Sequence, residues 1–325
     1  MRRRLPPSLQ LRDFALLWSS LLTNGLAAQM MAVAIGWQVY SIHRNPLDLG
    51  LVGLTEFVPL PILALPAGQL ADRLPRRAVT AASYLVGIGI AVALVFVTLA
   101  GAHALWPYLS LAAVTGIAQV VGNPAGRAMT PEIVPQELIP GALALRSVGS
   151  QIGVIAGPAL GGVVFAVEPV AVYATAAGLL TMSFAAVVAM RPVARSLVTT
   201  EPPGWESLVA GVRFVLRTRM LLGAIALDLF GVLLGDSIAL APVFARSILH
   251  TGPIGLGLLR TAPSVGALAA GLLLARRPLR RPAGPTLLVV VAGGAVMIGI
   301  AAVWPKVFPA LSRMGPLGEL RPEPV

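Results

Sequence analysis

The sequence predicts an all-α fold, a polytopic bundle of about nine transmembrane helices. Of its 325 residues, 57% are hydrophobic and only 11% are charged, whereas about a quarter of the residues in an ordinary soluble domain are charged. Apolar runs of about 18 residues or more, the length needed to span a bilayer, recur along almost the whole chain. Arginines punctuate these runs at alternate ends. The predicted solvent for most of the chain is therefore lipid.

Nine apolar segments follow one another, and each is long enough to cross the bilayer as a helix. The first is unusually long, so we expect part of it to lie at the membrane interface. The basic start at Met1–Arg4 is similar to that of a signal peptide, but the apolar stretch after it is too long for one, and we interpret it as a retained span. The segments are Phe14–Tyr40, Asp48–Leu70, Ala78–Gly101, Leu105–Gly126, Gly141–Ala166, Pro169–Met190, Met220–Phe244, Ile254–Ala275 and Thr286–Trp304.

The distribution of basic residues predicts a cytoplasmic N-terminus. Arginines gather before the first span and in the loops after the second, fourth, sixth and eighth spans, with Arg127 assigned to the loop after the fourth, whereas the loops on the other side hold only Arg44 and Arg246. Cytoplasmic loops retain positive charge. Nine spans then place the C-terminus on the outside.

Four regions are predicted from the spacing of the spans. Residues 1–190 form an N-terminal six-helix bundle, and residues 191–219, which include Pro202-Pro203-Gly204, form a cytoplasmic linker. Residues 220–304 form an incomplete C-terminal bundle of three spans, and residues 305–325 form a polar, Pro-rich tail.

An internal repeat supports the division into two membrane halves. The second span and its exit read Gly53-Leu-Thr-Glu-Phe-Val-Pro59 and Gly68-Gln-Leu-Ala-Asp-Arg-Leu-Pro-Arg-Arg77. The eighth span and its exit read Gly257-Leu-Leu-Arg-Thr-Ala-Pro263 and Gly271-Leu-Leu-Leu-Ala-Arg-Arg-Pro-Leu-Arg280. Secondary transporters are often built from such repeats.

The loop between the second and third spans, residues 68–77, has one acidic residue among arginines, and we call it the gate loop. Gly68 allows two helices to approach closely. Asp72 can form charge-assisted hydrogen bonds with neighbouring arginines and so hold an inner gate in one of two arrangements. The simpler alternative is that the arginines only anchor the loop. The candidate gate residues are Gly68, Asp72, Arg73, Arg76 and Arg77.

The fifth span has glycines at steps of four, which give a helix one smooth face for close packing, and a proline that can kink it. From the residue chemistry alone, a packing stripe is the favoured interpretation. The glycines at steps of four are Gly149, Gly153, Gly157 and Gly161, with Pro158 and Gly162 beside them.

These motifs resemble those of the major facilitator superfamily. The gate loop is similar to the signature loop of that superfamily, with Pro75 at a usual glycine position, and Gly153–Gly162 resembles the fifth-helix motif of its proton-coupled exporters, with Ala144 at the usual upstream glycine. Stretches such as Gly36–Tyr40, Gly122–Ala125 and Pro242–Arg246 resemble the bacterial branch of enterobactin and macrolide exporters. The resemblance implies a twelve-helix, alternating-access fold in the bacterial inner membrane that exports lipophilic molecules in exchange for protons. It also implies a C-terminal truncation, because only three spans follow the linker.

Four ionisable residues are predicted to lie within spans, where such groups are costly and by default suggest a function. They are Glu56, Asp228, Asp236 and Arg260. Glu56 and Arg260 occupy equivalent positions in the repeat, and with Asp236 they are predicted to meet in the outer half of a central cavity. Proton binding to a carboxylate would then release Arg260. A permanent structural salt bridge is the alternative.

Other chemistries are disfavoured by composition. The sequence has no cysteine, and His43, His103 and His250 lack the spacing of metal ligands, so no metal site and no cofactor are predicted. The only lysine is Lys306, which excludes a phosphate-binding loop ending in Lys-Ser/Thr. The net charge of +11 is spread between apolar segments rather than over one polar domain, so nucleic acid is not an expected partner.

The predicted function is secondary active transport, not enzymatic catalysis. The resemblance indicates export of an amphipathic small molecule, drug-like or siderophore-like, by proton antiport, with the lipid bilayer as the environment. The alternatives are a truncated relative that no longer transports, an uptake protein and a channel.

Overall fold

The structure is a computed structural model that describes residues 6–63, 66–67, 74–101, 104–191, 213–218, 221–223, 225–226 and 237–276. The chain divides into two compact units, Met1–Pro202 with Ile238–Gly271, and Pro203–Ser237 with Leu272–Val325. In the second unit the described residues at 213–217, 221–223, 225–226 and 272–276 are helical. The first unit contains the candidate site and is described below.

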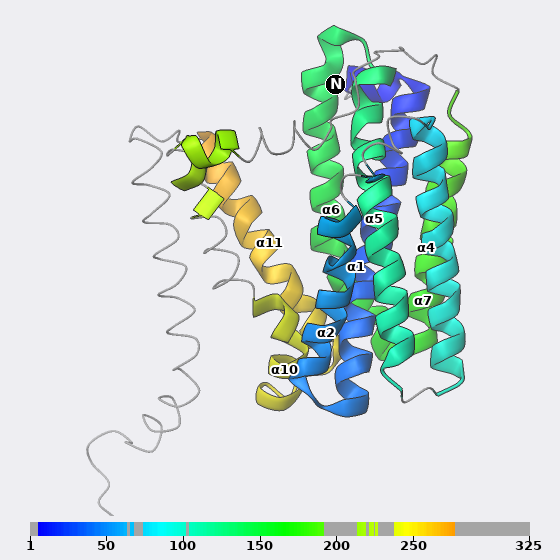
Figure 1. Cartoon of the computed structure of the whole chain (residues 1–325), viewed down its shortest axis with the longest axis vertical. Coiled ribbons are helices and arrows are strands. Elements are labelled where there is room, and N and C mark those ends of the chain that lie inside the picture. Colours follow the sequence, from blue (N-terminus) through cyan, green and yellow to red (C-terminus); the bar gives the residue numbers. More distant parts are fainter. Residues whose placement is uncertain are drawn as a thin grey trace, which may run out of the picture. The chain divides into compact units, whose positions relative to one another are not determined.

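All regular structure among the described residues is helical, which confirms the predicted fold class (Figure 1). Five stretches are long and apolar enough to cross a membrane: Arg12–His43, Pro46–Leu63, Arg76–Leu99, Gln136–Val167 and Pro169–Val188. They correspond to the first, second, third, fifth and sixth predicted spans. The described α-helices of the first 190 residues include α1 (Arg12–His43), α2 (Pro46–Phe57), α4 (Arg76–Leu99), α5 (Trp106–Ile133), α6 (Ile139–Val167) and α7 (Pro169–Val188).

Local sequence explains where several of these helices begin and end. Arg44 adopts the left-handed conformation that ends α1, and the Asn45 side chain accepts a hydrogen bond from the Leu47 amide at the start of α2. Proline occupies the first turn of α2, α5, α6 and α7, where its missing N–H has no helical partner to lose.

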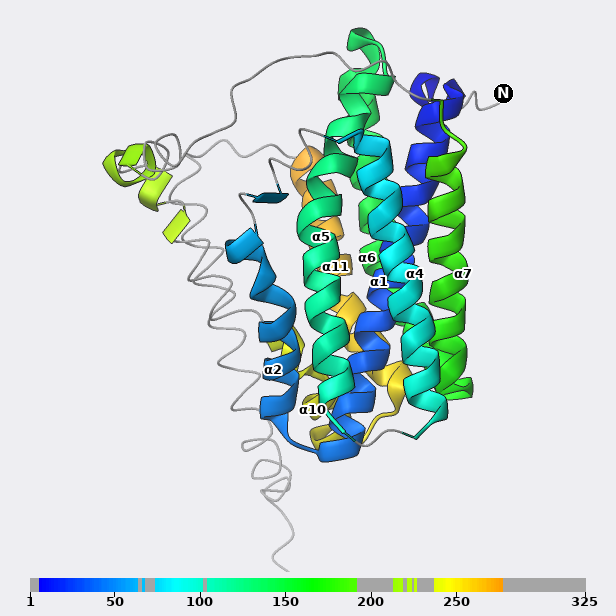
Figure 2. The ribbon, with the colours of Figure 1, turned by 45° about the vertical axis from the view of Figure 1, so that its right-hand side comes forward.

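The six helices pack as a bundle in which α1 contacts both α6 and α7, and α4 contacts both α5 and α7. Helix α2 packs on α5, and Figure 2 shows the two side by side. Inside the bundle, the Tyr173 hydroxyl donates to Gln38 Oε1 over 2.8 Å, and Gln38 donates to Thr98 over 3.1 Å. These bonds satisfy polar groups that have no water partner in lipid.

The predicted fourth span differs from the structure in its length. The predicted segment ended at Gly126, whereas α5 continues to Ile133. The hydrophobic run ends before the helix does, because the last turns of α5 carry polar residues that pack against other helices. Arg127 therefore belongs to a helix rather than to a loop.

The seventh span is described only in part. Its end is irregular: η3 (Ser237–Leu240), the short α10 (Ala241–Val243) and the π-helix η4 (Phe244–Ile248) follow one another. This end docks on α1, where the Tyr40 hydroxyl lies 2.7 Å from Ser247 Oγ and the Arg246 guanidinium lies over the Trp37 ring and donates to Ser41. The eighth predicted span is helix α11 (Pro253–Arg276). The ninth lies outside the described residues.

Candidate functional site

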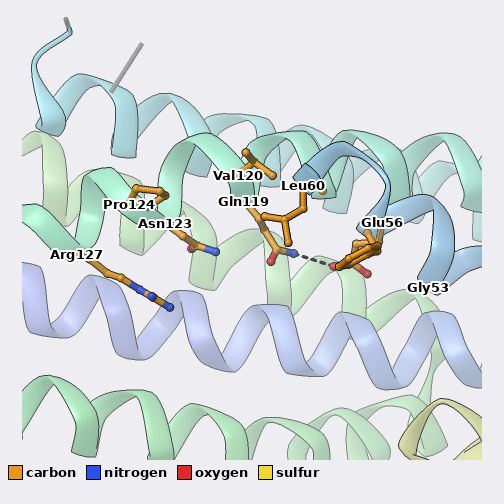
Figure 3. A pocket seen from close by; sticks show the side chains of 10 residues that line it. Gly53, Glu56, Leu60, Gln119, Val120, Asn123, Pro124 and Arg127 are labelled. Carbon is orange, nitrogen blue, oxygen red and sulfur yellow. Dashed lines mark hydrogen bonds between the residues drawn. The ribbon is translucent and has the colours of Figure 1, made fainter. Parts of the chain in front are cut away.

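A cavity of about 550 Å³ lies between α2 and its continuation on one side and α5 on the other. Figure 3 shows it at close range. This volume lies within the range of small-molecule sites. The lining residues combine apolar side chains with a few polar ones: Gly53, Glu56, Phe57, Leu60, Gly116, Gln119, Val120, Asn123, Pro124 and Arg127.

The cavity depends on an unusually close approach of the two helix backbones. A Cβ atom added at Gly116 would lie 2.1 Å from the carbonyl oxygen of Glu56 and 3.2 Å from Pro59 Cγ. No side chain fits there, so glycine is what allows α2 to rest directly on α5. This contact fixes the distance between Glu56 and the polar side chains of α5.

Glu56, one of the predicted intramembrane charges, lines this cavity. Its carboxylate accepts a hydrogen bond from Gln119 Nε2 over 2.8 Å (Figure 3). Arg260 of α11 acts on it electrostatically, but the two side chains form no direct ion pair among the described residues. The structure thus places Glu56 and Arg260 within electrostatic range and shows Gln119 as the direct partner of the carboxylate.

Arg260 lies at the contact of α11 with α1. A Cβ atom at Gly36 would be 3.7 Å from Arg260 Nη2 and 3.3 Å from Pro242 Cγ. Gly36 thus lies against both the Arg260 guanidinium and Pro242, and the stretch Gly36–Tyr40 meets the end of the seventh span. Asp236, the third member of the predicted charge cluster, and Asp228 lie outside the described residues, and their roles stay predictions.

A row of polar side chains on α5 was missed from the sequence. Gln119, Asn123 and Arg127 recur at steps of four, so they share one helix face, and all three line the cavity (Figure 3). The spacing alone could have revealed this face. The hydrophobic run ends before Arg127, so hydropathy alone places this residue in a cytoplasmic loop and hides its place on the helix face.

The glycine motif of the fifth span packs α6 against two helices at once. Cβ atoms at Gly153, Gly157 and Gly161 would lie 3.0 Å or less from atoms of Gly25, Gln29 and Met30 of α1. On another face, a Cβ at Gly162 would lie 2.5 Å from Pro253 O, and one at Gly257 would lie 2.5 Å from Pro158 O. Thr261 Oγ1 donates to Ile155 O over 3.1 Å across this second contact. The motif therefore joins α6 closely to α1 and to α11.

The described part of the gate loop consists of its last residues, and these bind within the bundle. Arg76 forms an ion pair of 2.8 Å with Glu132 and donates to Ala128 O over 3.1 Å, so it links α4 to α5. Arg77 donates from Nε to Val187 O over 3.1 Å and also to Val188 O at the end of α7. Gly68, Asp72 and Arg73 lie outside the described residues.

Replacing Arg77 with alanine is expected to lower the free energy of unfolding by about 1 kcal/mol, because a cation at a helix C-terminus stabilises its last carbonyl groups. Thermal stability of the purified protein in detergent measures this. Arg191→Ala is the matched control: Arg191 is exposed and lies just after α7, and among the described residues its one hydrogen bond runs from its backbone amide to the Asp13 carboxylate. Equal melting of the parent and Arg77→Ala would contradict the capping role.

Comparison with known proteins then assigns the chain to a family. Residues 6–314 match the transmembrane secretion effectors, a family of the major facilitator superfamily (MFS). The chain belongs to this family. A relative in Bacillus subtilis (strain 168), the uncharacterized MFS-type transporter YfiS, is 27% identical over 281 residues. The alignment covers 81% of this chain and 66% of the relative, so the chain spans less than two thirds of that protein.

Membership in the MFS confirms the predicted superfamily and identifies a multi-pass membrane protein of a transporter family. The enterobactin and macrolide branch stays a prediction. Among the described residues no cluster of three potential metal ligands occurs. The chemistry available in the cavity is that of one carboxylate, two amides and one guanidinium beside apolar walls.

Proposed function

We infer that this MFS protein exports an amphipathic small molecule in exchange for protons, by alternating access. The observation that supports this most directly is Glu56. A carboxylate within a membrane span is energetically costly, so its presence there by default suggests a function. Glu56 lines a cavity of ligand size, accepts a hydrogen bond from Gln119, and is within electrostatic range of Arg260 on another helix. A proton and a substrate can therefore bind in the same cavity.

The proposed location is the bacterial inner membrane with the N-terminus in the cytoplasm. One end of the bundle carries Arg12, which donates to Ala189 O over 3.3 Å, together with Arg76 and Arg77. Guanidinium groups at helix ends are favoured on the cytoplasmic side, so we propose that this end of the bundle faces the cytoplasm.

The function is tested with the full chain reconstituted in lipid vesicles. Efflux of a panel of amphipathic dyes and drugs is followed with and without an imposed pH gradient. We expect at least one compound to move faster when the gradient is present. Substrate movement that is indifferent to the gradient for every compound would contradict proton antiport, and ion current without exchange would indicate a channel.

Asp72 in the gate loop is proposed to stabilise one arrangement of the inner gate. The corresponding position in the repeat is Ala275, which cannot replace the carboxylate. Asp72→Asn is expected to slow transport several-fold, because it removes the charge from a charge-assisted network, while insertion into the membrane stays normal. Initial efflux rates at equal protein amounts measure this. Export at the parental rate would show that the gate loop has no gating role and that its arginines only anchor it.

A further inference from the structure

Arg127 is a charged residue of the cavity that has no part in the roles proposed above for Glu56 and the gate loop. It lies on α5 and is exposed, and it makes no ion pair or hydrogen bond in the part of the chain that the structure describes. The nearby carboxylate of Glu132 is bound to Arg76 instead. A guanidinium that lines a cavity of ligand size, with no partner among the described side chains and backbone groups, is available for an anionic ligand group.

The surroundings of Arg127 increase its attraction for anions. Arg146 of α6 lies within electrostatic range of it. Arg146 itself is held in place, since it donates to Gly126 O over 2.9 Å and to Thr130 Oγ1 over 3.1 Å. Two guanidinium groups therefore reinforce the positive potential at this end of the cavity, and of these two only Arg127 has no hydrogen-bond or ion-pair partner among the described residues.

The opposite end of the cavity has the opposite charge. Arg127 follows Gln119 by two helical steps of four residues, which corresponds to about 12 Å along α5. Gln119 binds the Glu56 carboxylate. Between the two ends lie the apolar side chains of Leu60, Val120 and Pro124 and the amide of Asn123. A ligand is thus oriented by charge, with its anionic group directed away from Glu56.

We propose that the cavity binds an amphiphile through an anionic group, a carboxylate, sulfonate or phosphate, held by Arg127. Guanidinium matches the geometry of such oxyanions and can donate two parallel hydrogen bonds. Asn123 adds a further donor one turn away, and the apolar wall accommodates the body of the ligand. This inference rests on the proposed transport function for its biological meaning, but the binding site is testable without transport.

The test compares two fluorescent probes on the purified full chain in lipid nanodiscs: anilinonaphthalene sulfonate and phenylnaphthylamine, which has the same ring system without the sulfonate. Empty nanodiscs give the background. Arg127→Gln is expected to weaken binding of the sulfonate about tenfold or more, because a hydrogen bond to a charged group is lost. Binding of the neutral probe should change less than about twofold. Arg127→Lys should retain part of the preference.

Arg191→Gln is the matched control, because it removes one exposed positive charge from the same unit without altering the cavity lining. Its affinities for both probes should equal those of the parent. Unchanged binding of the neutral probe shows that Arg127→Gln is folded.

Equal affinity of the parent and Arg127→Gln for the sulfonate, or saturable binding of neither probe by the parent, would overturn the proposal. Proton-driven transport in the vesicle assay, with no Arg127 dependence of sulfonate binding, would refute the anion site and leave the transport function intact. Sulfonate binding that depends on Arg127, without proton-driven transport, would refute antiport and leave the anion site intact.

Discussion

Gly116→Ala is expected to separate α2 from α5 and to disrupt the cavity between them. The added Cβ would lie 2.1 Å from the Glu56 carbonyl oxygen and 3.0 Å from its carbonyl carbon. Both atoms belong to the backbone, so no side-chain rotation can relieve the overlap, and one helix must move as a whole. Overpacking commonly lowers the free energy of unfolding by 1–3 kcal/mol, and we expect Gly116→Ala to lower it by about 3 kcal/mol. Thermal stability in detergent and binding of phenylnaphthylamine both measure the effect.

Gly89→Ala provides the matched control on α4. A Cβ atom there would have no heavy atom within 4 Å. Alanine also favours a helix over glycine by about 0.5–1 kcal/mol, so this variant should be as stable as the parent or slightly more so. If Gly116→Ala melted at the same temperature as Gly89→Ala, the close contact between α2 and α5 would not exist in the protein.

Glu56→Gln is expected to impair the coupling of export to protons severely. Glutamine has nearly the same shape and keeps a carbonyl oxygen that can accept the hydrogen bond from Gln119. Its amide cannot release or bind a proton in the pH range in which the protein works. We expect gradient-driven export to fall about tenfold or more, within the range by which a positioned proton-transfer group affects rates. Exchange of substrate across vesicles without a gradient should change much less. Initial rates with and without a pH gradient separate the two effects.

Glu137→Gln serves as the control for Glu56→Gln, because Glu137 is an exposed carboxylate on η2 (Gln136–Leu138). It should leave coupling unchanged. Gradient-driven export at the parental rate in Glu56→Gln would exclude Glu56 as the proton carrier.

Exchanging the charges of Glu56 and Arg260 distinguishes a proton switch from a static interaction. A purely structural attraction should tolerate the double variant, because the two charges remain of opposite sign. A proton switch should lose coupling even when the protein folds, because the carboxylate would then lie against Gly36 of α1 and away from Gln119. Proton-driven export retained by the swapped protein would refute the switch.

Which segments are helices long and apolar enough to span the membrane was determined by the sequence alone. A helix that crosses lipid must satisfy all its backbone hydrogen bonds internally and present apolar side chains over a fixed length. Both requirements are local, so the runs that became α1, α4, α6 and α7 could be recognised with no knowledge of their neighbours. Glu56 was also identified locally, since a charge inside an apolar run is conspicuous.

Contacts between helices were decided by the tertiary structure. Glu56 binds Gln119, which is 63 residues away, and that pairing depends on Gly116 bringing two backbones together. Arg127 was assigned to a loop because hydrophobicity ends before α5 does, and only the packing of α2 on α5 shows that its side chain lines a cavity. Local composition reports the preference of a segment for lipid. The partner of a polar side chain inside the bundle is set by the relative position of whole helices, which no single segment contains.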